Sequence, residues 1–390
     1  MVKITLIYAG HQIDYLYGLL SGFQNNPNLS VNIVDTERFD EKIVSTSNNV
    51  KFLNYLDKKG KTIISEIFRW IKYYIKLTIY LFKSDTEVIH IEWINRKIDF
   101  FEHIYFILMK FLTKKKIVFK VHDLDTNVLL KGGTKKHDTL KFSNLFFLKN
   151  CDGIITHNNF VKSILIKNGI SETKIRVIPH GINNYQILDN ISKNNARQIL
   201  GIDQEKKVLL FFGNIRSYKC LDLLLQMCAN LKERHSQVHL IIAGKNDITD
   251  NGLNRKMKLL IKHLEKTKSI TYLPGFVKNS DTSLFFKASD ALVLPYKFIY
   301  QSGLPFLSFA AGLPVISSNV GGLPEDIDQY INGYVTKLDS LEEVLEQFIT
   351  GDLKFNSPQE IIECANKTFN WKLIINQNLK LYEEIRKRKL

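Results

Sequence analysis

The chain has 390 residues, of which 45% are hydrophobic, so its length favours two globular domains over one. The formal net charge is +15, and residues 51–150 alone carry 20 Lys and Arg against 10 Asp and Glu, which indicates an anionic partner or a Lys-rich soluble surface. Four Cys without CxxC spacing disfavour a disulfide framework and indicate reduced thiols in the cytoplasm.

Short, nearly all-apolar runs alternate with helical segments along the whole chain, which is typical of parallel sheets covered by helices on both faces. We therefore predict an α/β protein with two doubly wound domains, which bind ligands where the carboxyl ends of strands meet helix N-termini. The expected strands of the first domain are 3–10, 31–35, 87–93, 116–123, 151–158 and 175–179, and those of the second are 208–214, 238–245, 270–276, 290–296 and 312–318.

The domain boundary is expected in a polar, Asn-rich stretch that follows Gly181. This places the two domains at 1–183 and 184–367, with a closing helix over 368–390. The first residues enter a strand-like run directly, and no apolar run is long enough to cross a bilayer, so we expect neither a signal peptide nor a spanning helix.

Residues 61–83 predict a basic, aromatic helix, and 100–116 predict a second helix that ends in three Lys. The apolar face of the first helix carries Phe68, Ile71, Ile75, Ile79 and Phe82. Its cationic face carries Arg69, Lys72, Lys76 and Lys83. Four amphipathic aromatic residues suit a lipid headgroup boundary, namely Trp70, Tyr73, Tyr74 and Tyr80. The alternative for each helix is a core helix with a solvated Lys face. Together, the two helices favour binding to an anionic membrane surface. The protein would then be cytoplasmic and held peripherally at the inner face of the cell membrane. Single-stranded nucleic acid would also suit basic and aromatic side chains, but no nucleic-acid motif is present and we expect no such partner.

Two strand ends carry side chains suited to chemistry. In FFGNIRSYK, Gly213 permits a tight turn while Arg216 and Lys219 stand beside the N-terminus of the next helix, which predicts a diphosphate site; the alternative is a capped loop with two solvated cations. In KVHDLDTN, His122 is a candidate acid, base or hydrogen-bond donor. The alternative for His122 is a satisfied histidine at a strand end, because three other strands carry His90, His157 and His180 in comparable positions.

Other common nucleotide and metal motifs are missing. The first strand-turn-helix, with Gly10 at its turn, is no GxGxxG fingerprint, and no GxxxxGK[ST] occurs, which disfavours NAD and P-loop binding. No HExxH or spaced Cys/His set is found, so we expect no metal and no cofactor.

Several segments, taken together, resemble GT-B glycosyltransferases of the large family-4-like group. The similar segments, in the family's order, are KIRVIPHGI, VLLFFGNIRSYKCLDLLL, VHLIIAGK, ITYLPGFV, ASDALVLPY, AAGLPVISSNVGGLPEDI and FNWKLIINQNLKLYEEI. The resemblance implies two Rossmann-like domains that face a central cleft. The N-terminal domain would bind the acceptor, the C-terminal domain the nucleotide sugar, and the closing helix would cross back to the N-terminal domain.

The resemblance also implies roles for single residues. Lys219 matches the Lys that contacts the donor diphosphate, while the family's Arg is Asn214 here, so that Arg216 would replace it. His122 stands where members often place a His near the donor sugar, and Gly10 matches a loop that faces the donor. Backbone groups of Phe276 and Val277 would hold the base.

One stretch departs from the family. Members typically carry two Glu, eight positions apart, and these positions are Ile299 and Leu307 here. The loop YQSGLP resembles a Gln-Ser-Gly form of the family, in which Gln301, Ser302, Gly303 and Leu304 would bind the donor through the Ser302 hydroxyl and backbone N–H groups. The departure leaves ribose recognition and the stereochemistry of transfer open.

The leading hypothesis is transfer of a sugar from a UDP- or GDP-sugar, without a metal and with retention, to a glycan or polyprenyl-diphosphate-linked acceptor in bacterial surface polysaccharide biosynthesis. A second hypothesis is a non-catalytic GT-B subunit that binds a glycan or a partner transferase. A third is a nucleotide-sugar epimerase of the same fold, which would need more acidic and His side chains in its cleft.

Overall fold

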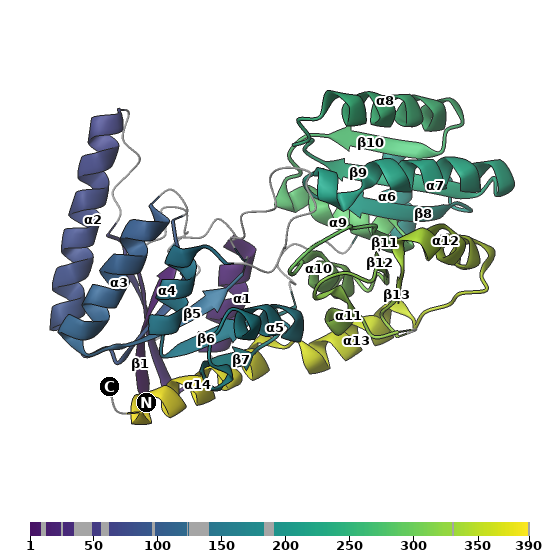
Figure 1. Ribbon diagram of the computed structural model, residues 1–390. Helices are drawn as coiled ribbons and strands as arrows, with labels where there is room; N and C mark the ends of the chain where they lie inside the picture. Colours follow the sequence, from purple (N-terminus) through teal and green to yellow (C-terminus); the bar gives the residue numbers. More distant parts are fainter. Residues whose placement is uncertain are drawn as a thin grey trace. The chain divides into compact units, whose positions relative to one another are not determined.

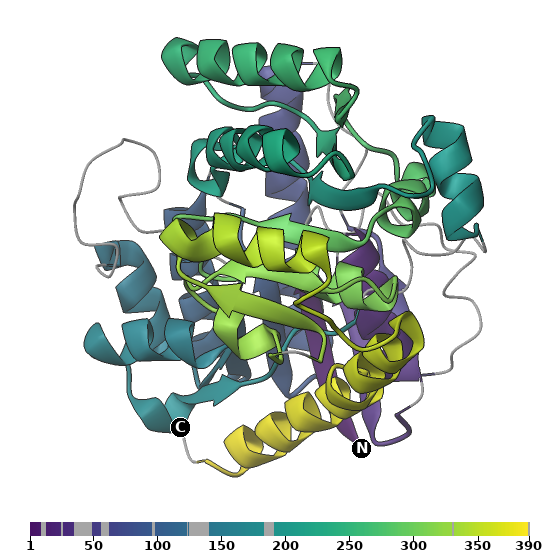
Figure 2. The ribbon, with the colours of Figure 1, turned by 90° about the vertical axis from the view of Figure 1, so that its right-hand side faces the viewer.

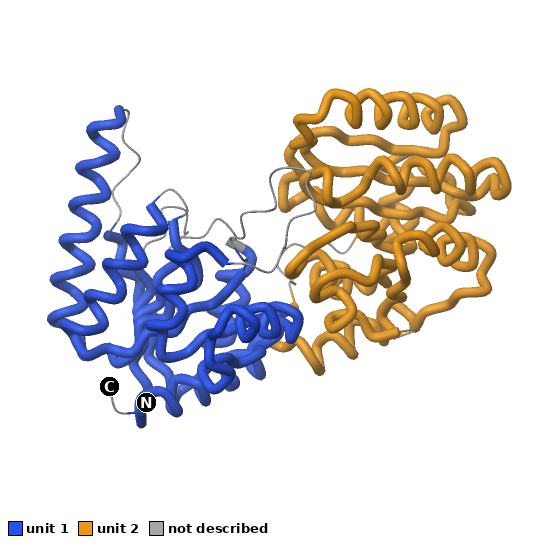
Figure 3. Tube along the Cα trace, viewed as in Figure 1, with its two compact units in different colours: residues 1–181, 371–390 blue, residues 182–370 orange. Residues whose placement is uncertain are grey.

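The computed structural model describes residues 1–8, 13–24, 26–34, 49–55, 62–95, 98–122, 124, 140–182, 191–329 and 331–388. The chain forms two compact α/β units, coloured separately in Figure 3. Unit 1 consists of 1–181 together with 371–390, and unit 2 consists of 182–370. The last helix therefore belongs to the first unit, and the sequence had placed the two divisions after residues 183 and 367.

Unit 1 is built on a seven-stranded sheet whose described pairings are all parallel. In sheet order its strands are β3 (Val50–Leu53), β2 (Leu29–Val34), β1 (Val2–Tyr8), β4 (Val88–Trp93), β5 (Lys116–Val121), β6 (Gly153–Thr156) and β7 (Ile175–Val177). The sequence predicted all of these except β3. Of its four residues only Val50 is buried, and Lys51 is exposed, so the strand lacks the apolar signature of its neighbours.

Helices cover both faces of this sheet (Figure 1). The helices of unit 1 are α1 (Ile13–Gln24), α2 (Ile63–Lys83), α3 (Asp99–Thr113), α4 (Phe142–Asn150), α5 (Asn159–Lys167), the 3-10 turn η2 (Glu172–Lys174) and α14 (Trp371–Lys387). On one face α1 and α14 share a core with Ile4, Leu6 and Tyr8 of β1. On the other face Tyr80 of α2 meets Thr5, because successive side chains of a strand point to opposite sides.

The C-terminal helix α14 is an integral part of the unit 1 core. The Trp371 indole lies in a slot beside Gly18 and Gly181. A Cβ atom added to either glycine would lie within 2.2 Å of the indole ring, so a larger residue would not fit there. Tyr382 is fully buried, and its hydroxyl lies 2.5 Å from Nδ1 of His90 in β4. The helix is seen alongside the unit 1 strands in Figures 1 and 2.

Helices α2 and α3 combine a buried face with an apolar outer face. Tyr73 and Tyr74 are buried, and Tyr80 bonds to Thr5, so the prediction that these tyrosines lie at a headgroup boundary is wrong. The Tyr74 ring packs against α3, whereas the Tyr80 hydroxyl is directed to the sheet. The expected apolar stripe, however, is on the outside: each of its members is about half exposed or more. They are Phe68, Ile71, Ile75, Ile79 and Phe82, and α3 adds Phe100, Phe101, Ile104, Leu108, Phe111 and Leu112.

Unit 2 has a six-stranded parallel sheet. In sheet order the strands are β10 (Ile270–Pro274), β9 (Val238–Gly244), β8 (Lys207–Phe212), β11 (Ala291–Leu294), β12 (Val315–Ser318) and β13 (Gly333–Thr336). The helices are α6 (Lys193–Leu200), η3 (Ser217–Lys219), α7 (Leu221–Arg234), α8 (Asn251–Lys266), α9 (Asn279–Ala288), α10 (Leu304–Ala310), α11 (Leu323–Asp326), η4 (Leu338–Ser340), α12 (Leu341–Thr350) and α13 (Pro358–Thr368). The edge strand β13 was not predicted, because three of its four residues are only partly buried.

Alternation along β8 divides the unit 2 core into two layers. Val208, Leu210 and Phe212 face one layer, with α6, α9, α10 and α13, while Leu209 and Phe211 face the other, with α7, α8 and α12. With both faces covered, the loops at the carboxyl edge of each sheet remain as the places where ligands bind in this architecture.

Candidate functional site

The loops after β8 and β11 gather cations at the carboxyl edge of the unit 2 sheet. β8 is followed by Gly213, whose φ of +84° belongs to the left-handed region that favours glycine. A Cβ there would lie 3.6 Å from Nζ of Lys219. Lys219 is 8% exposed, and its ammonium group lies 5.5 Å from the ring centroid of Tyr296. The N–H of Lys297, after β11, donates to the carbonyl of Tyr218 at 2.9 Å and so ties the two loops together.

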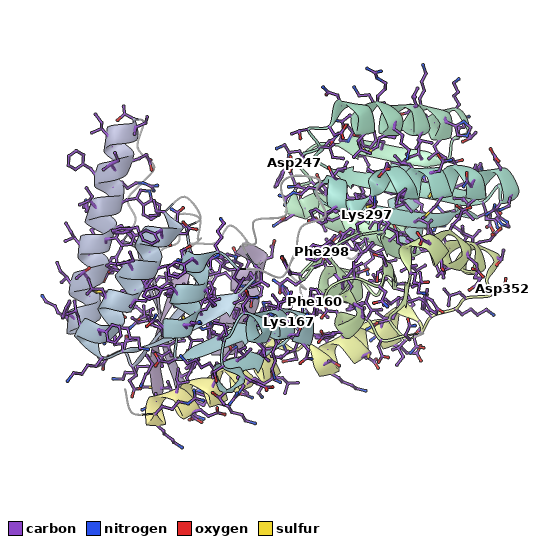
Figure 4. All side chains as sticks on the ribbon, in the orientation of Figure 1. Phe160, Lys167, Asp247, Lys297, Phe298 and Asp352 are labelled. Atoms are coloured by element: carbon purple, nitrogen blue, oxygen red, sulfur yellow. The ribbon has the colours of Figure 1, made fainter. Side chains whose placement is uncertain are left out.

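An acidic side chain stands in the same region. Nε of Arg216 lies 3.9 Å from Oδ2 of Asp247, and Nζ of Lys245 lies 3.0 Å from Oδ1 of that carboxylate. Figure 4 labels Asp247, Lys297 and Phe298 along one edge of unit 2. Four cations, which follow β8, β9 and β11, outnumber the Asp247 carboxylate, so this edge suits an anion. They are Arg216, Lys219, Lys245 and Lys297.

The charge state of Lys219 depends on its burial. Burial, and secondly the nearby Arg216, lower the pKa of Lys219 to about 8. A bound anion would stabilise the protonated form. Helix α7 begins at Leu221, two residues after Lys219, and its first N–H groups add the positive end of the helix dipole. The structure thus brings Gly213, Arg216 and Lys219 together in the way that the sequence predicted for a diphosphate site.

The Gln-Ser-Gly loop contains a hydrogen bond of its own. The N–H of Leu304 donates to Oγ of Ser302 at 3.3 Å, and the binding of the donor by this loop stays a prediction. Helix α10 begins at Leu304, with Gly303 at its N-cap, so this hydrogen bond lies at the entry to the helix. Ser302 and Gln301 are partly buried, and Gly303 is exposed.

Neither of the two positions that carry Glu in typical members offers a polar side chain. Leu307 is buried in the unit 2 core at 3% exposure. The carbonyl of Ile299 comes so close to Gly321 that a Cβ on that glycine would lie 1.6 Å from the oxygen. The next carboxyls along the chain are Glu325, which is exposed, and Asp326, whose pKa is raised well above its usual value by burial and then by Glu325.

The loop after β10 exposes the residues predicted to hold a nucleotide base. Gly275 has φ +133°, and the Phe276 side chain that follows is 83% exposed. Val277 packs against the core instead. Both remain predicted base-binding positions through their backbone groups.

In unit 1 the carboxyl ends of three strands converge on a cluster of buried polar and aromatic side chains. The ring of Tyr15 lies 5.0 Å from His122 and 4.9 Å from His180, centroid to centroid, and His122 lies 5.1 Å from His157. The histidines that the sequence treated as separate strand-end residues are therefore neighbours. Only His90 is apart from the strand ends, within β4.

Glu92 is the centre of this cluster. One carboxylate oxygen accepts from Nζ of Lys120 at 2.7 Å, and the other lies 2.8 Å from Nε2 of His122. Lys120 also donates to the hydroxyl of Tyr15 at 2.9 Å. All four side chains are less than 10% exposed, so the charges compensate one another inside the unit.

Burial keeps the predicted catalytic histidine neutral. It lowers the pKa of His122 well below the usual value, and Lys120 and then His180 act in the same direction. Burial also lowers the pKa of Lys120, against which the Glu92 carboxylate acts. The catalytic role of His122 stays a prediction. Gly10, which was predicted to face the donor, lies outside the described residues.

The sequence did not single out Glu92, Lys120, Asp247 or Lys297. A signal existed for the first two, because each interrupts an otherwise apolar strand, in VIHIEW and KIVFKV. Lys297 is the one charged side chain from Ala291 to Pro324. Among the described residues, no three His, Cys, Asp or Glu side chains are grouped so that they could hold a metal ion.

Two family models match consecutive parts of the chain. The model "Glycosyltransferase Family 4" matches residues 65–184, and "Glycosyl transferases group 1" matches 192–368. The chain belongs to the family-4-like glycosyltransferases with the GT-B fold.

Relatives and solved structures agree with this membership. An uncharacterised glycosyltransferase of Methanocaldococcus jannaschii is 25% identical over 298 residues, which cover 73% of each chain. The alpha-monoglucosyldiacylglycerol synthase of Streptococcus pneumoniae is 28% identical over 194 residues, or 48% of this chain and 42% of that protein. The crystal structure of Anabaena HepE in complex with UDP and glucose has a TM-score of 0.67 at 15% identity, and the match covers 98% of this chain and 100% of that one.

Proposed function

We propose that this glycosyltransferase moves a hexosyl group from a UDP- or GDP-sugar to a lipid-linked glycan in bacterial surface polysaccharide biosynthesis. The observation that carries the proposal is the buried Lys219, placed under the Gly213 turn and beside the N-terminus of α7. A diphosphate is the group whose two adjacent anions match a buried ammonium, a guanidinium and a helix N-terminus at one strand end.

The chemistry follows from the charge that develops when the glycosidic bond breaks. The nucleoside diphosphate leaves with additional negative charge, and Lys219, Arg216 and the N-terminus of α7 supply fixed positive charge to it without a metal. Retention of configuration is proposed by analogy with the family, with the acceptor hydroxyl attacking from the leaving-group side.

The acceptor is proposed to bind unit 1 at the cytoplasmic face of a membrane. The outer faces of α2 and α3 are apolar, while Lys72 and Lys83 of α2 are exposed beside the stripe. Exposed aliphatic and aromatic side chains next to Lys are characteristic of helices that lie in a lipid interface. Within the described ranges, every helix is too short or too polar to span a bilayer. A peripheral location on anionic lipid is therefore the proposed arrangement.

Thermal unfolding in the presence of a panel of UDP-, GDP- and ADP-sugars tests the donor. A ligand at 100 times its Kd stabilises a protein by about 2.7 kcal/mol, which is measurable as a rise in Tm. We expect a UDP- or GDP-sugar to raise the Tm and its hydrolysis or transfer to be detectable. No shift with any nucleotide sugar would reject the donor assignment.

A non-catalytic GT-B subunit is the second candidate, favoured by the lack of a polar side chain at Ile299 and Leu307. It makes a different prediction. No nucleotide sugar would then raise the Tm, and neither hydrolysis nor transfer would be observed with any acceptor.

A further inference from the structure

We infer that a groove between α2 and α3 binds the hydrocarbon chain of a lipid-linked acceptor, an assignment that rests on the proposed transfer to such an acceptor. The groove has a volume of about 800 Å³. Its walls include Ile67, Trp70, Ile71 and Ile75 of α2 and Phe101 and Tyr105 of α3. It follows α2 from Ile63 to Ile79, a length of about 24 Å at the rise of an α-helix.

The polar atoms at the base of the groove are engaged with one another. The hydroxyl of Tyr74 donates to Oε1 of Glu102 at 2.5 Å, and the N–H of Asn95 donates to Oε2 at 2.6 Å. The hydroxyls of Tyr105 and Thr78 are 3.0 Å apart. Burial and the neighbouring Glu102 also raise the pKa of Tyr74, so the ring stays neutral. The base therefore offers aromatic surface, which suits a methylene chain better than a peptide backbone.

One end of the groove approaches the buried cluster of unit 1. Asn95, which lines the groove, lies two residues beyond Trp93 at the carboxyl end of β4. The Trp93 ring is stacked on His122, with centroids 3.8 Å apart. A chain that lies in the groove would thus place its polar head toward the strand ends where a GT-B acceptor is proposed to react.

The charges around the groove favour an amphiphile with an anionic head over a second copy of this chain. The apolar stripe, whose Ile71, Ile75 and Ile79 also line the groove, is bordered by the exposed Lys72 and Lys83. The exposed Lys114 follows the end of α3. A second copy would bring like charges together at this face. An anionic lipid would meet complementary charge, and the same face would lie on the bilayer from which the lipid enters.

Quenching of Trp70 fluorescence provides a direct test. The probe is stearyl phosphate brominated at mid-chain, added to the full-length protein below the concentration at which the probe forms micelles. Bromine quenches indole at short range, and each buried methylene contributes roughly fourfold in affinity. We expect saturable quenching in the wild-type protein. Trp70→Phe should abolish most of it, which identifies the reporter, because the other indoles, Trp93 and Trp371, do not line the groove.

Two neighbouring substitutions provide the matched comparison. Ile67→Lys places a charge in the groove, whereas Phe68→Lys places the same charge one residue away on the outer stripe, outside the groove lining. Both original side chains are more than half exposed, so both variants should fold, and circular dichroism checks this. We expect Ile67→Lys to weaken binding of the probe at least tenfold and Phe68→Lys to change it less than threefold.

Three results would overturn the inference: no quenching in the wild type, equal effects of the two substitutions, or a dimer in light scattering that Ile67→Lys dissociates, which would make the groove an interface between copies. The outcome is separable from that of the donor site. If Lys219→Met loses nucleotide-sugar binding but keeps the quenching, both assignments stand. If no nucleotide sugar binds the wild type and the quenching remains, the proposed transfer fails while the chain-binding groove does not.

Discussion

The imidazole of His122 lies flat against the indole of Trp93, with ring centroids 3.8 Å apart and planes inclined by 8°. Nε2 of the same imidazole lies 2.8 Å from Glu92, which also holds Lys120. Because a carboxylate only accepts hydrogen bonds, it selects the tautomer of His122 that carries its proton on Nε2. A candidate catalytic histidine is thus fixed in plane by one neighbour and in tautomer by another.

Glu92→Gln should destabilise the protein by about 3–5 kcal/mol, because it leaves the Lys120 ammonium buried without its counter-charge. Denaturant unfolding followed by circular dichroism measures the loss. Adding Lys120→Met to Glu92→Gln should restore part of the stability, since both charges are then gone. Strictly additive losses in the two single variants and the double variant would show that the pair is not coupled.

Lys219→Met should weaken binding of UDP or GDP by tenfold or more, measured by calorimetry, since a buried charge-assisted contact to the diphosphate is worth roughly 1.5–3 kcal/mol. The variant should fold as well as the wild type or better, because removal of a buried ammonium ends its desolvation cost. Unchanged affinity for both nucleotides would remove Lys219 from the site.

Donor affinity should depend on pH through the same residue. The pKa of Lys219 is about 8 in the free protein, so the ammonium is present below that value and is lost above it. The Kd for the nucleotide should then be level below pH 8 and rise by up to about tenfold per pH unit above it. In Arg216→Ala the Kd should begin to rise at a higher pH, because the guanidinium that lowers the pKa of Lys219 is gone. In Lys219→Met the rise of the Kd with pH should vanish. A level Kd up to pH 9.5 in the wild type would contradict this.

The depressed pKa of Lys219 has the opposite effect on the stability of the unliganded protein. The folded pKa is about 8 and the ordinary value is 10.5, so between them the unfolded chain binds more protons. The contribution of this group to stability therefore rises with pH over that window. The free energies of unfolding of the wild type and Lys219→Met should therefore differ less at pH 10 than at pH 7. An equal difference at the two pH values would contradict the lowered pKa of Lys219.

Gly321→Ala should disrupt the loop that follows β12. The φ of Gly321 is +58°, and a Cβ would lie 1.6 Å from the Ile299 carbonyl oxygen, so the backbone must move. We expect a loss of stability above about 3 kcal/mol and weaker donor binding. Gly201→Ala is the matched control: its φ is +66° with nothing within 4 Å, so only the conformational cost of about 1–2 kcal/mol applies. Equal losses in the two variants would show that the contact with Ile299 is unimportant.

Flotation with vesicles tests the apolar outer face of α2. Ile75→Ser with Phe82→Ser should reduce recovery on vesicles that contain anionic lipid, because two exposed apolar side chains are removed from the stripe. Leu259→Ser on α8 of unit 2 is the control, since that leucine is equally exposed on a helix outside the stripe. Equal recovery of the wild type on neutral and anionic vesicles would reject the role assigned to the charge.

The sequence was sufficient for the architecture and for one of the two clusters of functional side chains. Apolar runs predict buried parallel strands, and they failed only at β3 and β13, in each of which only one residue is buried. Gly213, Arg216 and Lys219 could be placed together because they lie within seven residues of one another. Glu92, Lys120 and Tyr15 come from three separate elements, so their meeting depends on the order of strands in the sheet. The burial of Tyr74 was also not predicted. Helical spacing shows which residues share a face of a helix, but the element that packs against the helix decides which face is buried.

The return of α14 to unit 1 has a consequence for the order in which the protein is made. Unit 2 is continuous in sequence and can complete its core as soon as residue 370 has left the ribosome. Unit 1 emerges first but is completed last, because Trp371, Ile375 and Tyr382 fill its core. Until these last residues arrive, the slot beside Gly18 and Gly181 is open and His90 has no tyrosine partner. A message truncated near its 3′ end would therefore yield a well-formed second unit attached to a first unit with an exposed apolar core, a species that chaperones and proteases recognise.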